Sequence, residues 1–384
     1  MKIFFLPTSY PNKNNPQKAI FIYEQAKQLA LLGHEVTVLH VEKLPTRDIL
    51  KVINNKVSVI DDGFAVRYTI QQKTFMEEKF PELNKRSFLR NAEKLFKQAV
   101  DERGKPDVIY AHFSRWAGYA GAKLSAKYNI PLVTMEHFGG LLRERLPISL
   151  KKCVMETVQA SKYFICVSNN LKNIIEKQIC DGKIIYVIGN MVDDCFKYKP
   201  IIAHEGFVFC AIGRLNEAKN YKMLIRAFIN AFAKNEKVYL RIGGDGEERK
   251  QLEKIVLDEE RQHQIKFLGA LTREETLNEY INCNSFALSS SWETYGIVYR
   301  EALAVGRPIV TTDHGGFSQS DWHSEYGYKV PVKDVDAFSD ALKLMIKNYK
   351  KFQGEKISEM CLKDCAADLV SKKIEAFLMN AAQN

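Results

Sequence analysis

Short apolar runs alternate with longer amphipathic segments along the whole chain. In the first half the apolar runs occupy residues 2–7, 35–41, 107–113, 131–138, 163–168 and 184–190. Segments with helical periodicity follow most of these runs, and Gly33 stands where a helix C-cap belongs before the second run. Because parallel strands need crossover helices that cover the sheet, this alternation predicts a doubly wound parallel α/β sheet.

The second half repeats the same rhythm. Its apolar runs occupy residues 207–213, 238–244, 265–269, 285–290 and 308–312, and helical patterns separate them. Two Rossmann-like units in tandem therefore explain the whole pattern, joined near residues 193–206.

Composition is that of an ordinary globular protein, with 46% apolar and 27% charged residues in 384. No apolar stretch approaches the roughly 18 residues of a membrane span. Charge divides unevenly: residues 1–200 carry 31 Lys and Arg against 20 Asp and Glu, whereas residues 201–384 carry 25 against 26. The basic half, at +11, indicates nucleic acid, anionic lipid or a phosphorylated substrate, and charge alone does not choose among them.

The cysteines and one acidic pair bear on metals and on the cellular compartment. Eight cysteines are scattered without a C-x-x-C pair or a histidine at zinc spacing, so we expect reduced core residues of a cytoplasmic protein. Asp334 and Asp336 match a metal-binding D-x-D superficially, but they precede a helical pattern in which Asp is an ordinary N-cap. We therefore expect neither a metal nor another cofactor.

Unusual residues follow the strands of the second half. Arg214 and Lys219 lie in the loop after the strand that ends at Gly213, just before a helix. A guanidinium and an ammonium beside a helix N-terminus suit a diphosphate, and the alternative is two solvated surface cations. The glycines of residues 243–246 form either a phosphate-binding turn or simply a tight one.

Residues 289–310, "SSSWETYGIVYREALAVGRPIV", hold two glutamates around a helix start. If Gly296 begins the helix, Glu293 stays in the loop and Glu301 falls about one and a half turns in. The N–H groups of Tyr295, Gly296 and Ile297 then suit an anion, Glu301 suits the hydroxyls of a ribose, and Glu293 suits a sugar. Alternatively Glu293 caps the helix and Glu301 is solvated.

These stretches resemble a known family. "GRLNEAKNYKMLIRAF", the two-glutamate stretch and "TTDHGG" are similar in order and spacing to the C-terminal domain of family 4 glycosyltransferases, whose hallmark is Glu, seven residues, Glu. "DVIYAHF", "NIPLVTMEHFGG" and "CVSNNLKNII" resemble the N-terminal domain more loosely. The resemblance implies the GT-B fold, with two Rossmann-like domains facing a cleft. Their expected bounds are 1–198 for acceptor binding and 199–364 for nucleotide-sugar binding, while helix 365–384 returns to the first domain.

The resemblance also implies roles for single residues. Arg214 and Lys219 would neutralise the donor diphosphate, Glu301 would hold the ribose, and Glu293 would bind the donor sugar. His137 would approach the reacting sugar from the N-terminal domain. Such enzymes retain the anomeric configuration, usually by a front-face mechanism that needs no protein nucleophile.

Two positions in the first half stay open. Where many family members carry a Gly-Gly loop, this chain has Lys18 and Ala19, which leaves the geometry of the donor loop undecided. His112 follows a buried strand, and it belongs either to the cleft or to the core.

The resulting functional hypothesis is a retaining glycosyltransferase that uses a nucleotide-sugar, in the first place a UDP-sugar. Its acceptor would be a saccharide or lipid-linked, in the synthesis of cell-surface polysaccharide or glycolipid. The alternatives are a nucleotide-sugar epimerase of the same fold and a non-catalytic glycosyltransferase-like partner subunit. Nucleic acid is not an expected partner, because the basic half lacks a recognisable module with clustered aromatics.

Two segments mix apolar residues with cations. Residues 84–100 place Phe88, Leu89, Ala92, Leu95 and Phe96 near one helical face with cations around it, and residues 141–152 repeat the mixture. Either they dock on an anionic membrane surface, which would make the protein peripheral on the inner face of the cell membrane, or the helix packs on the sheet with its cations solvated.

Overall fold

The computed structural model describes residues 1–12, 15–44, 56–74, 80–142, 146–180, 182–202, 204–317 and 322–383. The chain forms two compact units, and each is described by itself. Unit 1 comprises Met1–Met191 and Asp368–Asn384, and unit 2 comprises Val192–Ala367. The first change of unit falls at residue 191 rather than at the expected 198, because Val192 and Phe196 are buried in the core of unit 2.

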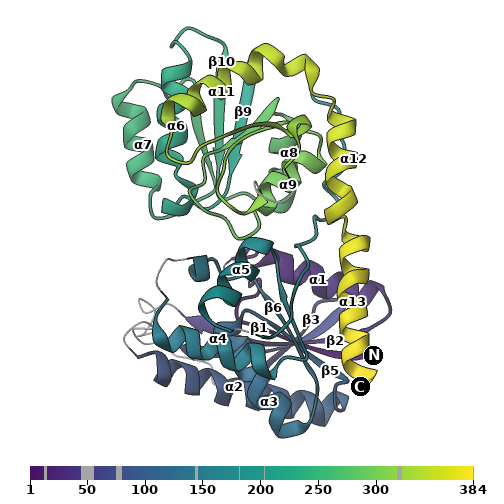
Figure 1. Cartoon of the computed structure of the whole chain (residues 1–384). Coiled ribbons are helices and arrows are strands. Elements are labelled where there is room, and N and C mark those ends of the chain that lie inside the picture. The colour runs from purple at the N-terminus through teal and green to yellow at the C-terminus, as the bar shows by residue number, and fades with distance from the viewer. Residues whose placement is uncertain are drawn as a thin grey trace. The chain divides into compact units, whose positions relative to one another are not determined.

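Unit 1 is built on a sheet that contains eight strands among the described residues (Figure 1). The strands are β1 (Lys2–Pro7), β2 (Glu35–Leu44), β3 (Ser58–Asp61), β4 (Ala65–Lys73), β5 (Val108–His112), β6 (Leu132–Glu136), β7 (Tyr163–Cys166) and β8 (Ile185–Val187). Their spatial order is β3-β4-β2-β1-β5-β6-β7-β8, and only the β3–β4 pair is antiparallel. This is the predicted doubly wound sheet, with an added edge hairpin.

The helices of unit 1 supply the expected crossovers. They are α1 (Ile20–Leu31), α2 (Pro81–Arg103), the π-helical turn η2 (Ser114–Gly118), α3 (Tyr119–Tyr128), the 3₁₀ turn η3 (Gly139–Leu142), α4 (Ile148–Ala160), α5 (Asn169–Gln178) and α13 (Ala367–Gln383). Helix α13 packs on this unit: Phe377 contacts the rings of Tyr163 and Tyr186, and Glu375 bonds His34 Nε2 at 2.8 Å.

Helix α2 settles one of the open alternatives. Phe88, Ala92, Leu95 and Phe96 are buried in the core cluster that α2 forms with the sheet, and Leu89 packs against it. The cations Arg86, Arg90, Lys94 and Lys97 are exposed. The apolar face of this helix is thus used within the fold, as the packed-helix alternative predicts. Of the other basic segment, residues 143–145 lie outside the described residues.

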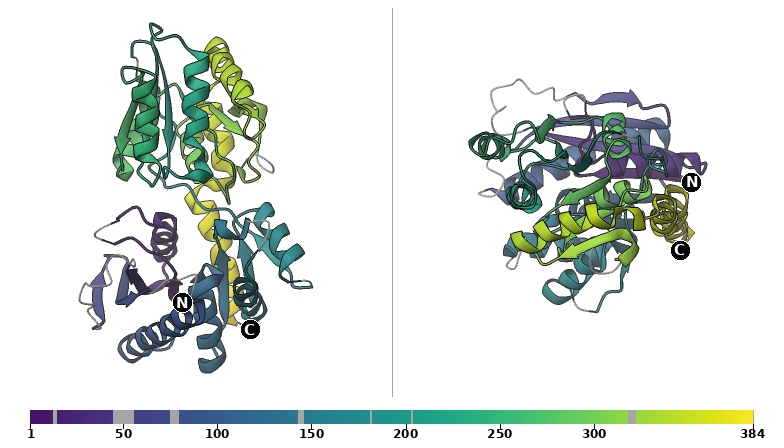
Figure 2. Two further views of the ribbon diagram at one scale, coloured as in Figure 1. Left: turned by 90° about the vertical axis from the view of Figure 1, so that its left-hand side faces the viewer. Right: turned by 90° about the horizontal axis from the view of Figure 1, so that it is seen from above.

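Unit 2 is a second parallel sheet, with six strands among its described residues. The strands are β9 (Phe207–Ile212), β10 (Val238–Gly243), β11 (Ile265–Gly269), β12 (Ser285–Leu288), β13 (Ile309–Thr312) and β14 (Gly327–Val330), in the order β11-β10-β9-β12-β13-β14. The helices are α6 (Tyr221–Ala231), α7 (Arg249–Asp258), α8 (Arg273–Ile281), α9 (Ile297–Ala304), α11 (Val335–Asn348) and α12 (Gly354–Cys365). They cover both faces of the sheet (Figure 2). The predicted fold class is confirmed.

Smaller expectations can also be compared with the structure. All eight cysteines are free thiols, and only Cys195 is not fully buried. Asp334 caps helix α11, where its carboxylate accepts the N–H of Ala337 at 2.9 Å, as predicted. Within the part of the chain that is described, no helix combines the length and apolarity needed to cross a membrane.

Candidate functional site

In unit 2 the loops after β9 and β12 meet because these two strands are neighbours in the sheet. Two hydrogen bonds join the loops: Ser291 N–H donates to the carbonyl of Ala218 at 2.7 Å, and Ser289 Oγ donates to that of Asn220 at 2.7 Å. This junction brings Lys219 Nζ onto the carboxylate of Glu293, although the two residues are far apart in sequence. The carboxyl ends of these strands are where the sequence predicts ligand binding.

Glu293 is a buried, ionised carboxylate. Besides Lys219 it accepts a hydrogen bond from Ser290 Oγ at 2.9 Å, and its side chain is only 10% exposed. Burial alone would raise the pKa of Glu293, but Lys219 and these hydrogen bonds help to lower it below its usual value. The residue does not cap helix α9, because Gly296 is the N-cap and no side chain caps that helix. The capping alternative is therefore wrong.

The loop after β13 closes over Glu293. A Cβ on Gly316 would lie 2.8 Å from the Cβ of Glu293, so only glycine allows this approach. His314 in the same loop is buried, and its ring stacks on that of Tyr299 with centroids 5.1 Å apart. Burial lowers the pKa of His314 to about 4, so its imidazole is neutral at neutral pH. The sequence analysis missed His314, although it stands inside the quoted "TTDHGG".

Glu301 is buried in helix α9 with 3% exposure, so the solvated alternative is wrong for it. Its carboxylate accepts from Arg273 Nη1 at 2.5 Å and from Tyr280 Oη at 3.2 Å. Burial alone would lower the pKa of Arg273, but Glu301 and Asp193 raise it. Sequence reasoning missed Arg273 and Tyr280, which lie two turns apart on one side of α8 and so can reach the same carboxylate.

The start of helix α9 has the predicted form. Gly296 is its N-cap with φ 75° and ψ 52°, a left-handed conformation that favours glycine. The first N–H groups of a helix have no partner in its own ladder, and Tyr299 N–H already donates to the carbonyl of Gly296 at 3.2 Å, so the amides of Ile297 and Val298 are the ones placed to meet an anion. Next to them Tyr295 is buried, and the guanidinium of Arg300 lies over its ring at 4.2 Å.

Arg214 differs from Lys219 in its surroundings. Its side chain is 70% exposed and pairs with Glu247 at 3.1 Å, which is the geometry of a solvated surface cation. The loop that carries it is fixed by the glycines after β10, because a Cβ on Gly244 would lie 1.9 Å from the carbonyl oxygen of Gly213. The glycine-rich turn thus serves close backbone packing.

In unit 1, His112 ends β5 and His137 follows β6, and the pairing of these strands brings the rings together. His112 Nδ1 and His137 Nε2 are 3.2 Å apart, and the residues are 0% and 6% exposed. Burial lowers the pKa of His137 to about 3, with a hydrogen bond to Asn190 acting against it, and it lowers that of His112 well below its usual value. Both imidazoles are therefore neutral at neutral pH.

Glu136, which the sequence analysis did not single out, ties these two loops together. Its fully buried carboxylate accepts the N–H groups of Ser114, His137 and Phe138, each at 2.8 Å, and the hydroxyl of Ser114. Burial raises the pKa of Glu136, and these hydrogen bonds oppose the rise. An acidic residue at the end of a buried strand was the signal that could have found it.

Ala19 occupies the position where the glycine loop was expected. It is the N-cap of α1 with φ 53° and ψ 39°, so an alanine holds the left-handed conformation that glycine favours. The next turn places the ring of Phe21 against that of His137, with centroids 4.8 Å apart. The segment thus lies beside the histidine pair, while the roles of Ala19 and His112 stay predictions.

Comparison with known proteins identifies both halves of the chain. Residues 195–358 match the model of glycosyl transferases group 1, and residues 19–195 match that of glycosyltransferase family 4. An uncharacterised glycosyltransferase of Methanocaldococcus jannaschii is 28% identical over 286 residues, which cover 73% of this chain and 76% of the relative. Mannosylfructose-phosphate synthase of Agrobacterium fabrum is 24% identical over 340 residues, which cover 78% of this chain and 71% of that synthase.

Solved structures share the fold. Sucrose-phosphate synthase from Thermosynechococcus elongatus superposes with a TM-score of 0.80 at 16% identity, over 99% of both chains. HepE of Anabaena, in complex with UDP and glucose, superposes with a TM-score of 0.73 at 17% identity, over 99% of this chain and 100% of its own.

Proposed function

Because this chain belongs to the family 4 glycosyltransferases, we propose that it transfers a sugar from a nucleoside diphosphate sugar to a saccharide or lipid-linked acceptor with retention of configuration. In this proposal unit 2 binds the donor and unit 1 binds the acceptor. Neither a metal nor another cofactor takes part.

The observation that carries the proposal is the Lys219–Glu293 ion pair at the junction of the β9 and β12 loops. Lys219 directly precedes Asn220, the N-cap of α6, and an ammonium at a helix N-terminus suits a diphosphate. Glu293, held ionised by its partners, then accepts hydrogen bonds from the sugar attached to that diphosphate. Arg214 reaches the outer phosphate oxygens when the donor displaces Glu247.

Glu301 is assigned to the nucleoside. Each carboxylate oxygen accepts about two hydrogen bonds, so the contacts from Arg273 and Tyr280 leave lone pairs for the two ribose hydroxyls. Arg273 also fixes the carboxylate in one orientation, which favours a rigid ribose site. The complex of HepE with UDP and glucose supports uridine as the base.

The chemistry proposed is a front-face substitution. The bond between the anomeric carbon and the phosphate oxygen breaks, and its electron pair leaves with the diphosphate. The acceptor oxygen bonds to that carbon on the same face, and its proton passes to the leaving phosphate oxygen. Lys219 and Arg214 stabilise the developing negative charge electrostatically. The neutral imidazole of His137 positions a sugar hydroxyl by a hydrogen bond, since a pKa of about 3 makes it a poor general acid at neutral pH.

A product of this kind fits the synthesis of cell-surface polysaccharide or glycolipid on the cytoplasmic side of a membrane. The basic first half, at +11, would favour acidic acceptors or an anionic membrane surface nearby.

Thermal unfolding with UDP, ADP and GDP, followed by transfer assays with the sugars of the preferred nucleotide, tests the proposal. Bound donor raises the melting temperature by mass action, and NMR of the product gives the anomeric configuration. Glu293→Gln and Lys219→Ala should abolish transfer, whereas Lys222→Ala, an exposed lysine of α6, should not. Conversion of the donor to an epimer without any acceptor would favour the epimerase instead. Absence of stabilisation by every nucleotide tried would overturn the donor site.

A further inference from the structure

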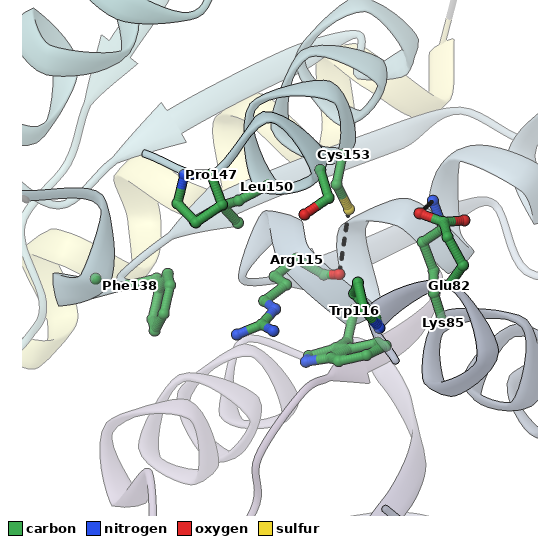
Figure 3. A pocket seen from close by; sticks show the side chains of 11 residues that line it. Glu82, Lys85, Arg115, Trp116, Phe138, Pro147, Leu150 and Cys153 are labelled. Carbon is green, nitrogen blue, oxygen red and sulfur yellow. Dashed lines mark hydrogen bonds and ion pairs between the residues drawn. The ribbon is translucent and has the colours of Figure 1, made fainter. Parts of the chain in front are cut away.

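Unit 1 contains a pocket of about 330 Å³ that the donor chemistry does not use (Figure 3). Its lining comes from four separate parts of the unit: Arg115 and Trp116 of η2, Lys85 of α2, Phe138 after β6, and Leu150 of α4. A volume of this size falls in the range of small-molecule sites. All of these lining residues belong to unit 1.

The pocket lies at the carboxyl ends of β5 and β6, the edge where doubly wound sheets bind ligands. Two of its walls follow the histidine pair along the chain, since Phe138 comes directly after His137 and η2 begins two residues after His112. Glu136 bonds the backbone at Ser114 and Phe138, and so holds both walls in register. A group bound here would therefore contact the two loops that follow the histidine pair in the chain.

The lining combines positive charge with apolar surface. The guanidinium of Arg115 lies over the Trp116 ring at 5.3 Å, and Figure 3 shows it extended between Trp116 and Phe138. Lys85 Nζ bonds Glu82 at 2.9 Å and lies over the ring of Tyr119 at 4.6 Å. The one acid in the lining, Glu82, pairs with Lys85, while Trp116, Phe138 and Leu150 supply apolar walls beside Arg115. Such a lining suits an anion attached to an apolar chain.

Exposed apolar side chains flank the lining residues along the sequence. Leu83 is 60% exposed beside Glu82, and Phe80 is 44% exposed beside Pro81. Ile148 is 74% exposed between Pro147 and Ser149 of the opposite wall. Apolar side chains are therefore exposed within one residue of the lining on both of these walls.

We propose that this pocket binds the acceptor as an anionic amphiphile, in which a phosphate joins an apolar chain to the acceptor sugar. Arg115 holds the phosphate, and the apolar walls hold the first part of the chain. A soluble saccharide or free phosphate would leave the apolar walls unused. The inference rests on the proposed function, of which it names the acceptor class.

Calorimetric titration of the full chain with octyl phosphate below its critical micelle concentration tests the site. Octyl glucoside and inorganic phosphate serve as probes that carry only the chain or only the anion. We expect octyl phosphate to bind at least tenfold more tightly than either. Equal binding of inorganic phosphate would reduce the site to an anion site, and equal binding of octyl glucoside would reduce it to an apolar one; either result overturns the proposal.

Matched variants locate the binding. Arg115→Met should weaken octyl phosphate at least tenfold, whereas Arg90→Met, an exposed arginine of α2 outside the lining, should leave the affinity unchanged. Leu150→Gln should also weaken the binding of octyl phosphate. Leu31→Gln, at an exposed leucine of α1, is the control and should leave the affinity unchanged. Circular dichroism checks that each variant is folded. If both Arg115→Met and Leu150→Gln fold and bind normally, the ligand sits elsewhere and the proposal fails.

Donor binding separates this inference from the function on which it rests. If UDP stabilises the wild-type chain and octyl phosphate does not bind, the acceptor class is wrong while the donor site stands. If octyl phosphate binds and no nucleotide stabilises the chain, the donor assignment is wrong.

Discussion

Replacing Lys219 by methionine should destabilise unit 2 strongly, because it leaves a buried carboxylate without its cation. The two side chains of the pair are 16% and 10% exposed, and Ser290 is the remaining hydrogen-bond donor whose contact with Glu293 the structure records. Removing one partner of a buried pair costs about 3–5 kcal/mol. Because both side chains keep some contact with solvent, we expect the lower end, about 3 kcal/mol.

The double variant Lys219→Met/Glu293→Gln should recover much of this loss, because it removes the uncompensated charge as well. We expect a coupling energy of about 2 kcal/mol between the two positions. Urea unfolding measures both quantities in a Trp116→Phe background, where the remaining tryptophans, Trp292 and Trp322, report on unit 2. Lys222→Met is the control for loss of an exposed lysine.

The pH dependence gives an independent reading of the same pair. Since the folded pKa of Glu293 is lowered, its stabilisation is fully present above the unfolded value of about 4.5 and is lost as pH falls through the folded pKa. Lys219→Met should abolish this acid-dependent loss. If Lys219→Met lowers the free energy of unfolding by less than about 1 kcal/mol and shows no coupling to Glu293, the two residues are not a buried, mutually dependent pair.

Three further predictions concern unit 1. Ala19→Gly should leave stability unchanged or raise it by up to about 1 kcal/mol in thermal unfolding, because the left-handed conformation strains alanine. Glu136→Gln should lower kcat for acceptor transfer while changing the donor KM less. The carboxylate accepts hydrogen bonds from backbone N–H groups, whereas the amide NH₂ of glutamine is a donor and cannot accept them. His137→Gln should reduce by about 2 kcal/mol the stability lost between pH 7 and pH 5, measured by urea unfolding, because a histidine with a lowered folded pKa destabilises the fold below its unfolded pKa.

Controls on neighbouring positions sharpen these three tests. Ala30→Gly, inside α1, should cost about 1 kcal/mol, so an equal cost at Ala19 would contradict the strain argument. Glu156→Gln, at a partly exposed position of α4, should leave turnover unchanged. A Glu136→Gln enzyme with normal kcat would contradict the positioning role of Glu136. His204→Gln is the exposed control for His137, and an unchanged pH dependence at His137 would mean that its ring is not buried as neutral imidazole.

The periodic parts of the fold were predictable because each buried strand is a short apolar run of its own. The hairpin of β3 and β4 was missed, since β3 is exposed along its whole length and carries no apolar pattern. In the site, the loop position of Glu293 followed from local spacing around Gly296. Its pairing with Lys219, and that of Glu301 with Arg273, depend on which strands and helices are neighbours in the fold. The burial of Glu293 and Glu301 also depends on these neighbours, so it could not be predicted from the sequence.

The position of α13 has a consequence for biogenesis. Unit 2 is one continuous segment, whereas unit 1 is completed by residues 368–384, which the ribosome makes after the whole of unit 2. The second sheet can therefore fold while the first still lacks the helix that covers Tyr163 and Tyr186. Until residues 368–384 emerge, these aromatic rings lack their cover on the nascent chain, so completion of the first unit waits for synthesis of the whole second unit.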